Sequence, residues 1–495
     1  MSDLYDPAYR PPGQALPIWN FEIEPTNIQY KNSPLPREPP LPEVEYERAQ
    51  IIAKLRLSFK DLCLSKLKKE APRESFNRWL FAQLTATERK DAFLPDPEKA
   101  TATPVLKSEI QNGLPAPAYV PWSVRKNADQ IIRAMNNYLT AAQRYIKFSM
   151  DFPNKKDILE TIKNRVEEAK AKHASDPQEL LKGIKNLHSE VWTLMEPTLQ
   201  PKIDELMQEL ASQAHQSINL LEDIYQEQKK RDHTRSGVSL LRTNQGYLIK
   251  YKTDALFLTE LHLKKLRTLY VMNTPEDSAC GLFLERLYIL LRRYQTFFGP
   301  DESGGTMHAA SPENVFNALN VKLGVQQENF ASPLNCFFKR FNSAFPDTDV
   351  YFGSLGSFFN FEPTTGSFET GPPYTEEIIT AMAEHLEHLL SSSSEPLSFV
   401  VFVPDWRDPL TPGLHMMEQS RYLVTDFVLE GNKSYVYVVG KQHEEKERYF
   451  SLPIDTHLYF MQNEAGRVKF PLEIDGNVAE LERECYKQRE HPTNT

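Results

Sequence analysis

Residues 398–403, SFVVFV, form a nearly continuous run of apolar residues rich in β-branched and aromatic side chains. A run of this kind is typical of a strand that is buried on both faces of a sheet. The segment 375–392 before it has the pattern of a helix, with Thr375 at the N-cap and two glutamates in the first turn. Strand, helix and strand in this order predict an open α/β sheet, whose ligand lies beyond the carboxyl ends of the strands. Further strands are predicted at 421–430, 434–439 and 457–462.

The N-terminal half has the spacing of helices instead. Apolar residues recur at three and four positions in 47–67, at Ile52, Leu55, Phe59 and Leu62, which predicts an amphipathic helix. The same pattern predicts helices at 73–84 and 124–150 and three more within 154–232, the last of them beginning at Pro201. We therefore expect a Pro-rich flexible arm at 1–45, a helical domain at 46–235, an α/β domain at 236–475 and a C-terminal tail at 476–495.

The first part of the α/β domain mixes both patterns. The segment 238–252 reads as a hairpin around Asn244, Gln245 and Gly246. Helices are predicted at 258–272, 277–299 and 312–323, with a Gly/Ser loop at 299–312 and a strand at 348–361.

Composition limits the partners and the compartment. The formal net charge of −10 excludes indiscriminate binding of nucleic acid, so any RNA contact must be a local basic patch. The four cysteines are scattered and no metal-ligand spacing stands out among the 12 histidines, so we expect neither a disulfide framework nor a metal site. No apolar run is long enough to cross a membrane, and the N-terminus lacks the profile of a signal peptide. The composition does not distinguish a protein of the cytoplasm from one of the nucleus.

Several strings of the chain, in this order, resemble a known family. They are PRESFNRW (72–79), LLRRYQTFFG (290–299), ENFASPLNCFFKRFNSAFPDTDVYFGS (328–354), GSFETGPPYTEE (366–377), EPLSFVVFVPDWRDPLTP (395–412) and MEQSRY (417–422). Together they resemble the phosphorylated-CTD-interacting factor family of cap-specific adenosine methyltransferases. The resemblance covers residues 46–470 and is dense over 285–425. It implies a helical domain packed on a Rossmann-like methyltransferase domain.

The resemblance also implies an activity and its partners. The family methylates the 6-amino group of 2′-O-methyladenosine next to a 7-methylguanosine cap, with S-adenosylmethionine as the donor and no metal. The implied partners are the capped mRNA 5′ end and the phosphorylated C-terminal domain of RNA polymerase II, and the implied compartment is the nucleus. The family binds that polymerase domain through an N-terminal WW domain. No pair of well-spaced tryptophans precedes residue 46, so we expect the WW domain to be missing here.

The family's catalytic turn is Asn-Pro-Pro-Phe, and related enzymes carry either Phe or Tyr at its end. By position, the turn that acts in catalysis and holds the cofactor here is Gly371, Pro372, Pro373 and Tyr374. An exocyclic aryl amine is a poor nucleophile because its lone pair is delocalised into the ring. A side-chain amide oxygen and a backbone carbonyl each accept one N–H and aim the lone pair at the methyl group. The prolines keep the carbonyl rigid and the aromatic ring stacks on the base, but glycine has no amide to offer.

Contacts to the RNA substrate are implied at other matched positions. In the helical domain the position is Arg78, and after the turn the positions are Glu376 and the run Trp406, Arg407, Asp408 and Pro409. Loss of one polar contact in an active site costs roughly 100- to 1000-fold in rate. We therefore expect a homologue that binds capped mRNA with reduced or lost catalysis and weakened cofactor binding. The alternative is an active S-adenosylmethionine-dependent methyltransferase acting on cap-proximal adenosine.

Overall fold

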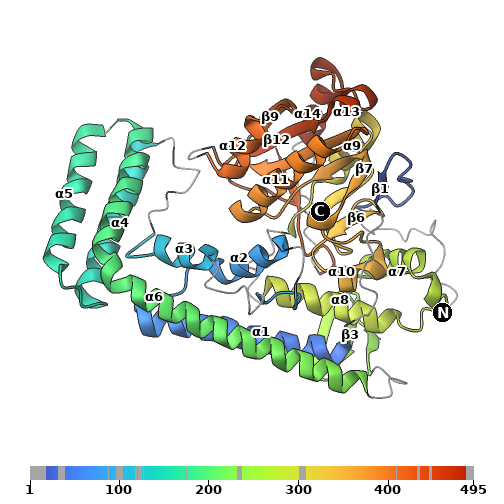
Figure 1. Ribbon diagram of the computed structural model, residues 1–495, viewed down its shortest axis with the longest axis horizontal. Coiled ribbons are helices and arrows are strands. Elements are labelled where there is room, and N and C mark those ends of the chain that lie inside the picture. The colour runs from blue at the N-terminus through green and yellow to red at the C-terminus, as the bar shows by residue number, and fades with distance from the viewer. Residues whose placement is uncertain are drawn as a thin grey trace.

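The computed structural model describes residues 18–31, 40–86, 89–95, 104–117, 120, 125, 127–173, 175–230, 237–299, 308–407, 410–431, 435–444 and 449–486. The N-terminal part of the chain is helical, and the C-terminal part is built on a mixed sheet with helices on both faces (Figure 1). This is the α plus α/β architecture that the sequence predicts. Within the described residues, no helix has the length and the apolar character needed to cross a membrane.

Two long helices form the base of the helical part. They are α1 (Pro42–Leu67) and α6 (Pro177–Lys229), which pack side by side (Figure 1). The helices α4 (Ala128–Phe148) and α5 (Lys155–His173) pack against the first half of α6. The short helices α2 (Ser75–Ala82) and α3 (Pro104–Asn112) lie between this base and the sheet.

Helix α6 differs from its prediction. The sequence predicts a helix that begins at Pro201, but α6 continues without a break through Pro197 and Pro201. Each proline removes one backbone hydrogen bond. The apolar stripe is nevertheless continuous across both prolines, since Met195, Leu199 and Ile203 are all fully buried. Burial of this stripe against neighbouring helices outweighs the lost hydrogen bonds.

A small sheet and two buried helices follow. The strands are β2 (Ser239–Arg242), β3 (Tyr247–Tyr251) and β4 (Asp254–Leu258), and β2 and β3 form the predicted hairpin. The helices are α7 (Glu260–Asn273) and α8 (Phe283–Phe298), and α8 packs on α1. Helix α8 thereby joins the helical part to the large sheet.

The large sheet has the order β6-β5-β7-β8-β12-β9, and β1 pairs antiparallel with the first residues of β7. Its members are β1 (Gln29–Tyr30), β5 (Glu328–Ala331), β6 (Phe341–Ser343), β7 (Pro363–Thr370), β8 (Leu397–Pro404), β9 (Leu423–Leu429) and β12 (Thr456–Gln462). Strands β6, β5, β7 and β8 are parallel, whereas β12 runs antiparallel to both β8 and β9.

Strand β8 is buried along its whole length, as SFVVFV predicts. Phe399 and Val401 face the helices α11 (Glu376–Ser392) and α12 (Pro412–Glu418). Val400 and Phe402 face the helices α9 (Glu313–Leu323) and α14 (Ala479–Tyr486) on the opposite side. The sheet is therefore the middle of three layers. The remaining short elements are β10 (Tyr437–Val438), β11 (Tyr449–Phe450) and α13 (Glu464–Lys469).

Three further segments differ from the sequence-based prediction. Residues 348–361 form no strand but short helical turns, α10 (Pro346–Asp349), η6 (Val350–Phe352) and η7 (Phe358–Asn360), because glycines and serines interrupt the aromatic residues. Residues 18–31 of the predicted flexible arm pack on the sheet, with β1 paired to β7. Residues 479–486 of the predicted tail form α14, which packs on α9. The domain boundaries themselves stay a prediction.

Candidate functional site

The order of the strands marks one place in the sheet for a ligand. From β5 the chain passes to β6 on one side, and later to β7 on the other side. The sheet thus has a topological switch point between β5 and β7, where open α/β sheets bind ligands beyond the carboxyl ends of the strands. Strand β7 ends at Thr370, so the turn Gly371-Pro372-Pro373-Tyr374 leaves the sheet at this point. The predicted catalytic turn therefore lies where the topology places a ligand.

The turn is held at both ends. Thr375 caps α11 by accepting a hydrogen bond from the Ile378 N–H, and its own N–H donates to the Pro373 carbonyl at 2.7 Å. The Tyr374 hydroxyl is 2.9 Å from the hydroxyl of Tyr437, and the two rings meet edge to face. The Tyr374 side chain is therefore fixed from both its backbone and its hydroxyl end.

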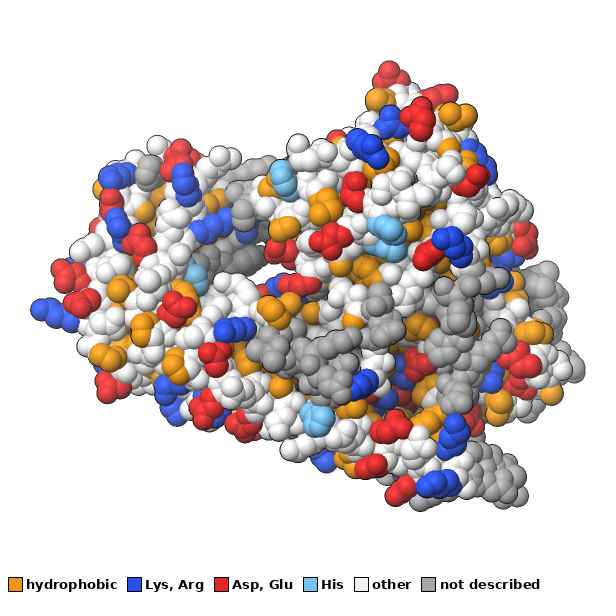
Figure 2. Space-filling model, viewed as in Figure 1, with side chains coloured by type: hydrophobic (Ala, Val, Ile, Leu, Met, Phe, Trp, Pro, Cys, Tyr) orange, Lys and Arg blue, Asp and Glu red, His pale blue; other side chains and the backbone are white. Residues whose placement is uncertain are grey.

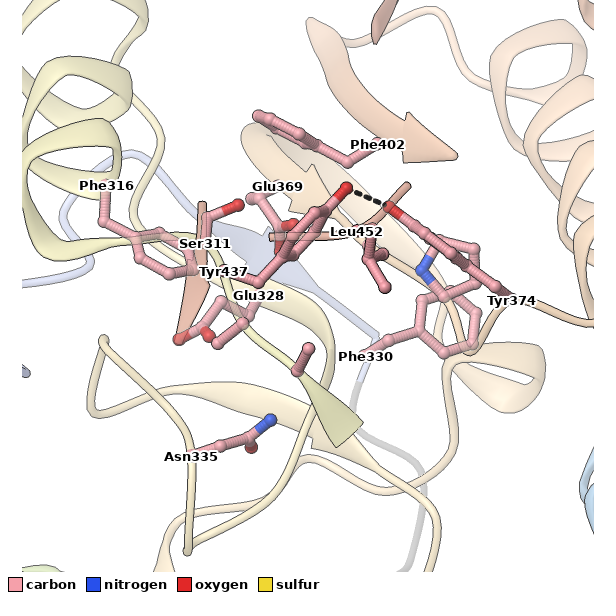
Figure 3. A pocket seen from close by; sticks show the side chains of 14 residues that line it. Ser311, Phe316, Glu328, Phe330, Asn335, Glu369, Tyr374, Phe402, Tyr437 and Leu452 are labelled. Atoms are coloured by element: carbon pink, nitrogen blue, oxygen red, sulfur yellow. Dashed lines mark hydrogen bonds between the residues drawn. The ribbon is translucent and has the colours of Figure 1, made fainter. Parts of the chain in front are cut away.

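Two cavities meet at Gly371. The first, about 500 Å³ including its opening, is lined by Gly371, Tyr374 and aromatic rings of the neighbouring strands (Figure 3). The second, about 630 Å³, lies toward α8 and the turn at 357–359. The residues that line both are Ala309, Phe330, Asn335 and Gly371. Ligands in the two cavities would face each other across Gly371.

Two buried carboxyl groups line the first cavity. Glu328 on β5 and Glu369 on β7 are directly opposite in the register of these parallel strands, and they are 2% and 4% exposed. Burial raises the pKa of Glu328 to about 7, although the N–H groups of Phe337 and Phe338 donate to its Oε2 at 2.7 and 2.9 Å. Burial and the neighbouring Glu328 raise the pKa of Glu369 well above its ordinary value. Like charges on neighbouring buried residues disfavour ionisation of both, so the pair keeps a proton to higher pH than free carboxyl groups do.

Gly371 lies directly against one of these carboxyl groups. Its N–H donates a hydrogen bond to Glu369. A Cβ atom added at Gly371 would lie 2.6 Å from Glu369 Oε1, closer than real Cβ contacts. The backbone of Gly371 is not in the left-handed region, so a side chain there meets no backbone strain. The obstacle to a larger residue at this position is the carboxyl group of Glu369.

The second cavity is aromatic and uncharged. His308 and Asn335 supply its polar wall, where His308 Nε2 is 2.7 Å from Ser332 Oγ and burial lowers the pKa of His308 to about 3. Asn329 also lines this cavity, and its Nδ2 donates to Thr370 Oγ1 at 2.9 Å. The Oδ1 of Asn329 is buried and has no hydrogen-bond partner among the described residues. A buried acceptor without a partner fits a polar ligand with a flat aromatic part, as S-adenosylmethionine is.

Arg78 connects the helical part to the turn. It donates to Glu377 on α11 at 2.7 Å and forms an ion pair with Glu109 on α3. Its guanidinium is thus already paired with two carboxylates, and it lines neither cavity. Its predicted contact with a capped end stays a prediction.

Of the other predicted substrate contacts, the described residues Glu376, Trp406 and Arg407 also line neither cavity. Trp406 packs partly buried against the cluster under α11 and α12. Arg407 is exposed and donates to Asp405, and Glu376 is exposed in the first turn of α11. Asp408 and Pro409 lie outside the described residues. Gly371, Pro372 and Tyr374 share the lining of the first cavity, whereas Glu376, Trp406 and Arg407 are absent from it.

A groove between the helical part and the sheet leads toward the first cavity. Figure 2 shows the hollow between the two parts. Its walls come from the end of α1, from 69–74, from α3 and from 452–454. Leu452 lines both this groove and the first cavity. Among the described residues, no cluster of side chains could hold a metal ion.

Comparison with known proteins identifies the family. Two relatives, from Homo sapiens and Mus musculus, are each named mRNA (2′-O-methyladenosine-N(6)-)-methyltransferase. They are 31% and 30% identical to this chain over 483 residues, which cover 91% of this chain and 68% of each relative. The chain belongs to this methyltransferase family. A family model described as "Phosphorylated CTD interacting factor 1 WW domain" also matches, over residues 265–440.

This match corrects one prediction. The sequence predicts that the WW domain is missing, but the family model of that name matches residues 265–440. The prediction was wrong because it rested only on the lack of paired tryptophans before residue 46. The matched segment lies far downstream and contains a single tryptophan, Trp406, so a tryptophan pair could not reveal it.

Sequence reasoning also missed Glu328, Glu369 and Asn329. A signal for Glu369 was present, because residues two apart in an extended strand face the same side. Glu369 therefore points to the side where a residue at position 371 would place its side chain. Glu328 and Asn329 gave no such signal, because the sequence did not predict β5 as a strand.

Proposed function

We propose that this protein binds S-adenosylmethionine and the capped 5′ end of an mRNA that begins with adenosine. We further propose that it methylates the adenosine 6-amino group more slowly than a relative with Asn in the turn. The observation that carries the proposal is the meeting of two cavities at Gly371, at the switch point of the sheet. The family relatives named as 2′-O-methyladenosine N(6)-methyltransferases support the substrate class.

The second cavity is the proposed cofactor site. Its aromatic walls would pack on the adenine ring, and Asn329 Oδ1 would accept a hydrogen bond from the ligand. Asn335 and His308 would add polar contacts. When bound, S-adenosylmethionine supplies a methyl group on a sulfonium, which is released to a nucleophile while the bonding electrons stay on sulfur.

The first cavity is the proposed site of the target adenine. Tyr374 lines it and offers the ring on which a base would stack. Pro372 lines it as well, and the neighbouring Pro373 faces the second cavity. The turn thereby separates the proposed donor and acceptor sites with a rigid backbone.

The groove is the proposed path of the RNA. It reaches the first cavity at Leu452, and its charged lining is mixed, with Lys69, Arg73 and Lys185 beside Glu70, Glu74 and Glu109. These cations would contact phosphates. The cap itself would be recognised by Arg78, Glu376 and the 406–409 run, as the family resemblance implies.

The phosphorylated C-terminal domain of RNA polymerase II is the proposed protein partner, and the nucleus the proposed compartment. The family model named for a phosphorylated-CTD-interacting factor supports this partner. Binding of a phosphorylated peptide of that domain, beside the unphosphorylated peptide, tests it. Equal affinity for both peptides contradicts it.

Calorimetry tests the ligand sites. We expect S-adenosylhomocysteine to bind the native chain, and Asn329→Leu to weaken that binding roughly tenfold, as loss of one buried hydrogen bond does. Capped RNA should bind more tightly than uncapped RNA at moderate salt. Absence of heat with S-adenosylhomocysteine, or equal affinities for both RNAs, contradicts the proposal.

A further inference from the structure

We propose that the Glu369 carboxyl group replaces the missing side-chain amide at position 371 and accepts a hydrogen bond from the adenosine 6-amino group. This inference rests on the proposed function, and it adds the residue that receives the reacting amine. Glu369 belongs to β7, the strand that precedes the turn.

The position of the carboxyl group carries the proposal. Glu369 and residue 371 are two apart at the end of β7 and so face the same side. Glu369 Oε1 lies 2.6 Å from the point where a Cβ at position 371 would lie. In asparagine the amide oxygen lies at about the same distance from the Cβ of that residue. Glu369 Oε1 therefore lies in the space around the amide that an asparagine at position 371 would have. Only a glycine at 371 leaves this space to Glu369.

The surroundings of Glu369 match the role. It lines the first cavity together with Gly371, Pro372 and Tyr374, so it shares the proposed adenine site with the stacking ring (Figure 3). The N–H of Gly371 donates to it and thereby holds it against the turn. A carboxylate is a stronger hydrogen-bond acceptor than an amide oxygen. Glu369 can therefore accept the amine N–H that the asparagine amide would accept.

The carboxylate also gives the released proton a destination. The amine nitrogen has two N–H groups, and Glu369 accepts one of them. As the nitrogen bonds to the methyl carbon, the bond between that carbon and sulfur breaks and its electron pair stays on sulfur. The nitrogen becomes positively charged and must lose one proton. The Glu369 carboxylate takes this proton, which leaves a neutral methylamino group and a neutral carboxyl group.

The charge of Glu369 depends on its neighbours from several elements. Glu328 on β5 disfavours ionisation, and Lys265 on α7 acts on Glu328. The hydroxyls of Tyr374, Tyr435 and Tyr437 lie nearby, and burial keeps all three neutral by raising their pKa values. Because the pKa of Glu369 is raised, the ionised form gains population as pH rises. The role predicts methyl transfer that increases with pH, and Glu369→Gln should lose this dependence.

A merely structural role predicts a different response. Two buried carboxyl groups in register oppose folding, so replacing one by an amide should leave stability unchanged or raise it. We expect Glu369→Gln to melt at or above the native temperature while its recognition of the amine weakens. A gain in stability together with a loss in recognition is typical of functional residues.

Binding measurements test the contact without relying on turnover. The probes are two capped RNAs, one beginning with 2′-O-methyladenosine and one with the 2′-O-methylated purine riboside, which lacks the 6-amino group. In the presence of S-adenosylhomocysteine, the native chain should prefer the adenosine RNA roughly tenfold. Glu369→Ala should remove this preference, and Glu369→Gln should keep part of it because the amide oxygen also accepts. Glu362→Gln, at an exposed carboxyl group that lines neither cavity, is the matched control and should keep the preference.

The outcomes separate this inference from the function on which it rests. If neither RNA binds the native chain, the proposed function is wrong and the inference falls with it. If both bind equally well, or if Glu369→Ala keeps the preference, the inference alone is wrong. S-adenosylhomocysteine binding and the melting temperature of each variant report whether it is folded.

Discussion

Arg78 on α2 donates a hydrogen bond of 2.7 Å to Glu377 in the first turn of α11. The same guanidinium is paired with Glu109 on α3. The helical part is thus linked directly to the helix that follows the Gly-Pro-Pro-Tyr turn. The orientation of the turn depends on how the two parts of the protein are packed.

Removing this link should destabilise the protein. Arg78→Met leaves Glu377 and Glu109 without their cation, and burial already raises the pKa of Glu109 above its ordinary value. We expect a loss of about 1–3 kcal/mol in the free energy of unfolding, because partly buried carboxylates lose a charged partner. Denaturant unfolding measures it, with the exposed Arg407→Met as the control. An unchanged midpoint for Arg78→Met would show that the link contributes nothing.

Restoring the family's asparagine should not by itself restore full activity. In Gly371→Asn the new Cβ meets Glu369 Oε1, so we expect less than a tenfold gain in transfer to cap-proximal adenosine. Gly371→Asn combined with Glu369→Ala removes the collision and should gain roughly 100-fold over the native chain. Single-turnover methyl transfer measures both. A large gain in the single variant would mean that Glu369 moves freely out of the way.

The sequence predicts strands β8, β12 and β9 better than the strands that form the site, β5 and β7. Strands β8, β9 and β12 are rich in β-branched and aromatic residues, and their positions are predicted correctly. Strands β5 and β7, with the sequences ENFA and PTTGSFET, carry polar residues, proline and glycine, which hide them from propensity. Glu328, Asn329 and Glu369 of these strands line the cavities, so the site is where local propensity fails. The pairing of Glu328 with Glu369 depends on the register of two strands that lie far apart in the sequence.

The Glu328 carboxyl should make stability depend on pH. Its pKa is raised from 4.5 to about 7 in the folded protein, so the folded state binds this proton more tightly than the unfolded state. Its contribution to stability is fully present below pH 4.5 and is lost as pH rises through about 7. In Glu328→Gln the free energy of unfolding should fall less between pH 4.5 and about 7, by on the order of 1–3 kcal/mol. Urea unfolding at several pH values measures this, and parallel curves for variant and native protein would contradict it.

The ring and the hydroxyl of Tyr374 should have separable roles. Tyr374→Phe removes the contact with the Tyr437 hydroxyl but keeps the ring, so it should cost about 0.5–1.5 kcal/mol of stability and keep the preference for capped adenosine RNA. Tyr374→Ala removes the stacking surface and should weaken binding of that RNA roughly tenfold or more. Fluorescence anisotropy with labelled capped RNA compares them. Equal RNA affinities in the two variants would place the base elsewhere.

Methyl transfer by the native chain tests the central claim most directly. The measurement follows a labelled methyl group from S-adenosylmethionine to RNA beginning with 2′-O-methyladenosine, with and without a 7-methylguanosine cap. We predict slow transfer to the 6-amino group of the first adenosine that requires the cap, and faster transfer in the Gly371→Asn, Glu369→Ala double variant. Absence of transfer in both proteins, or equal transfer to capped and uncapped RNA, would contradict a cap-adenosine site at Gly371.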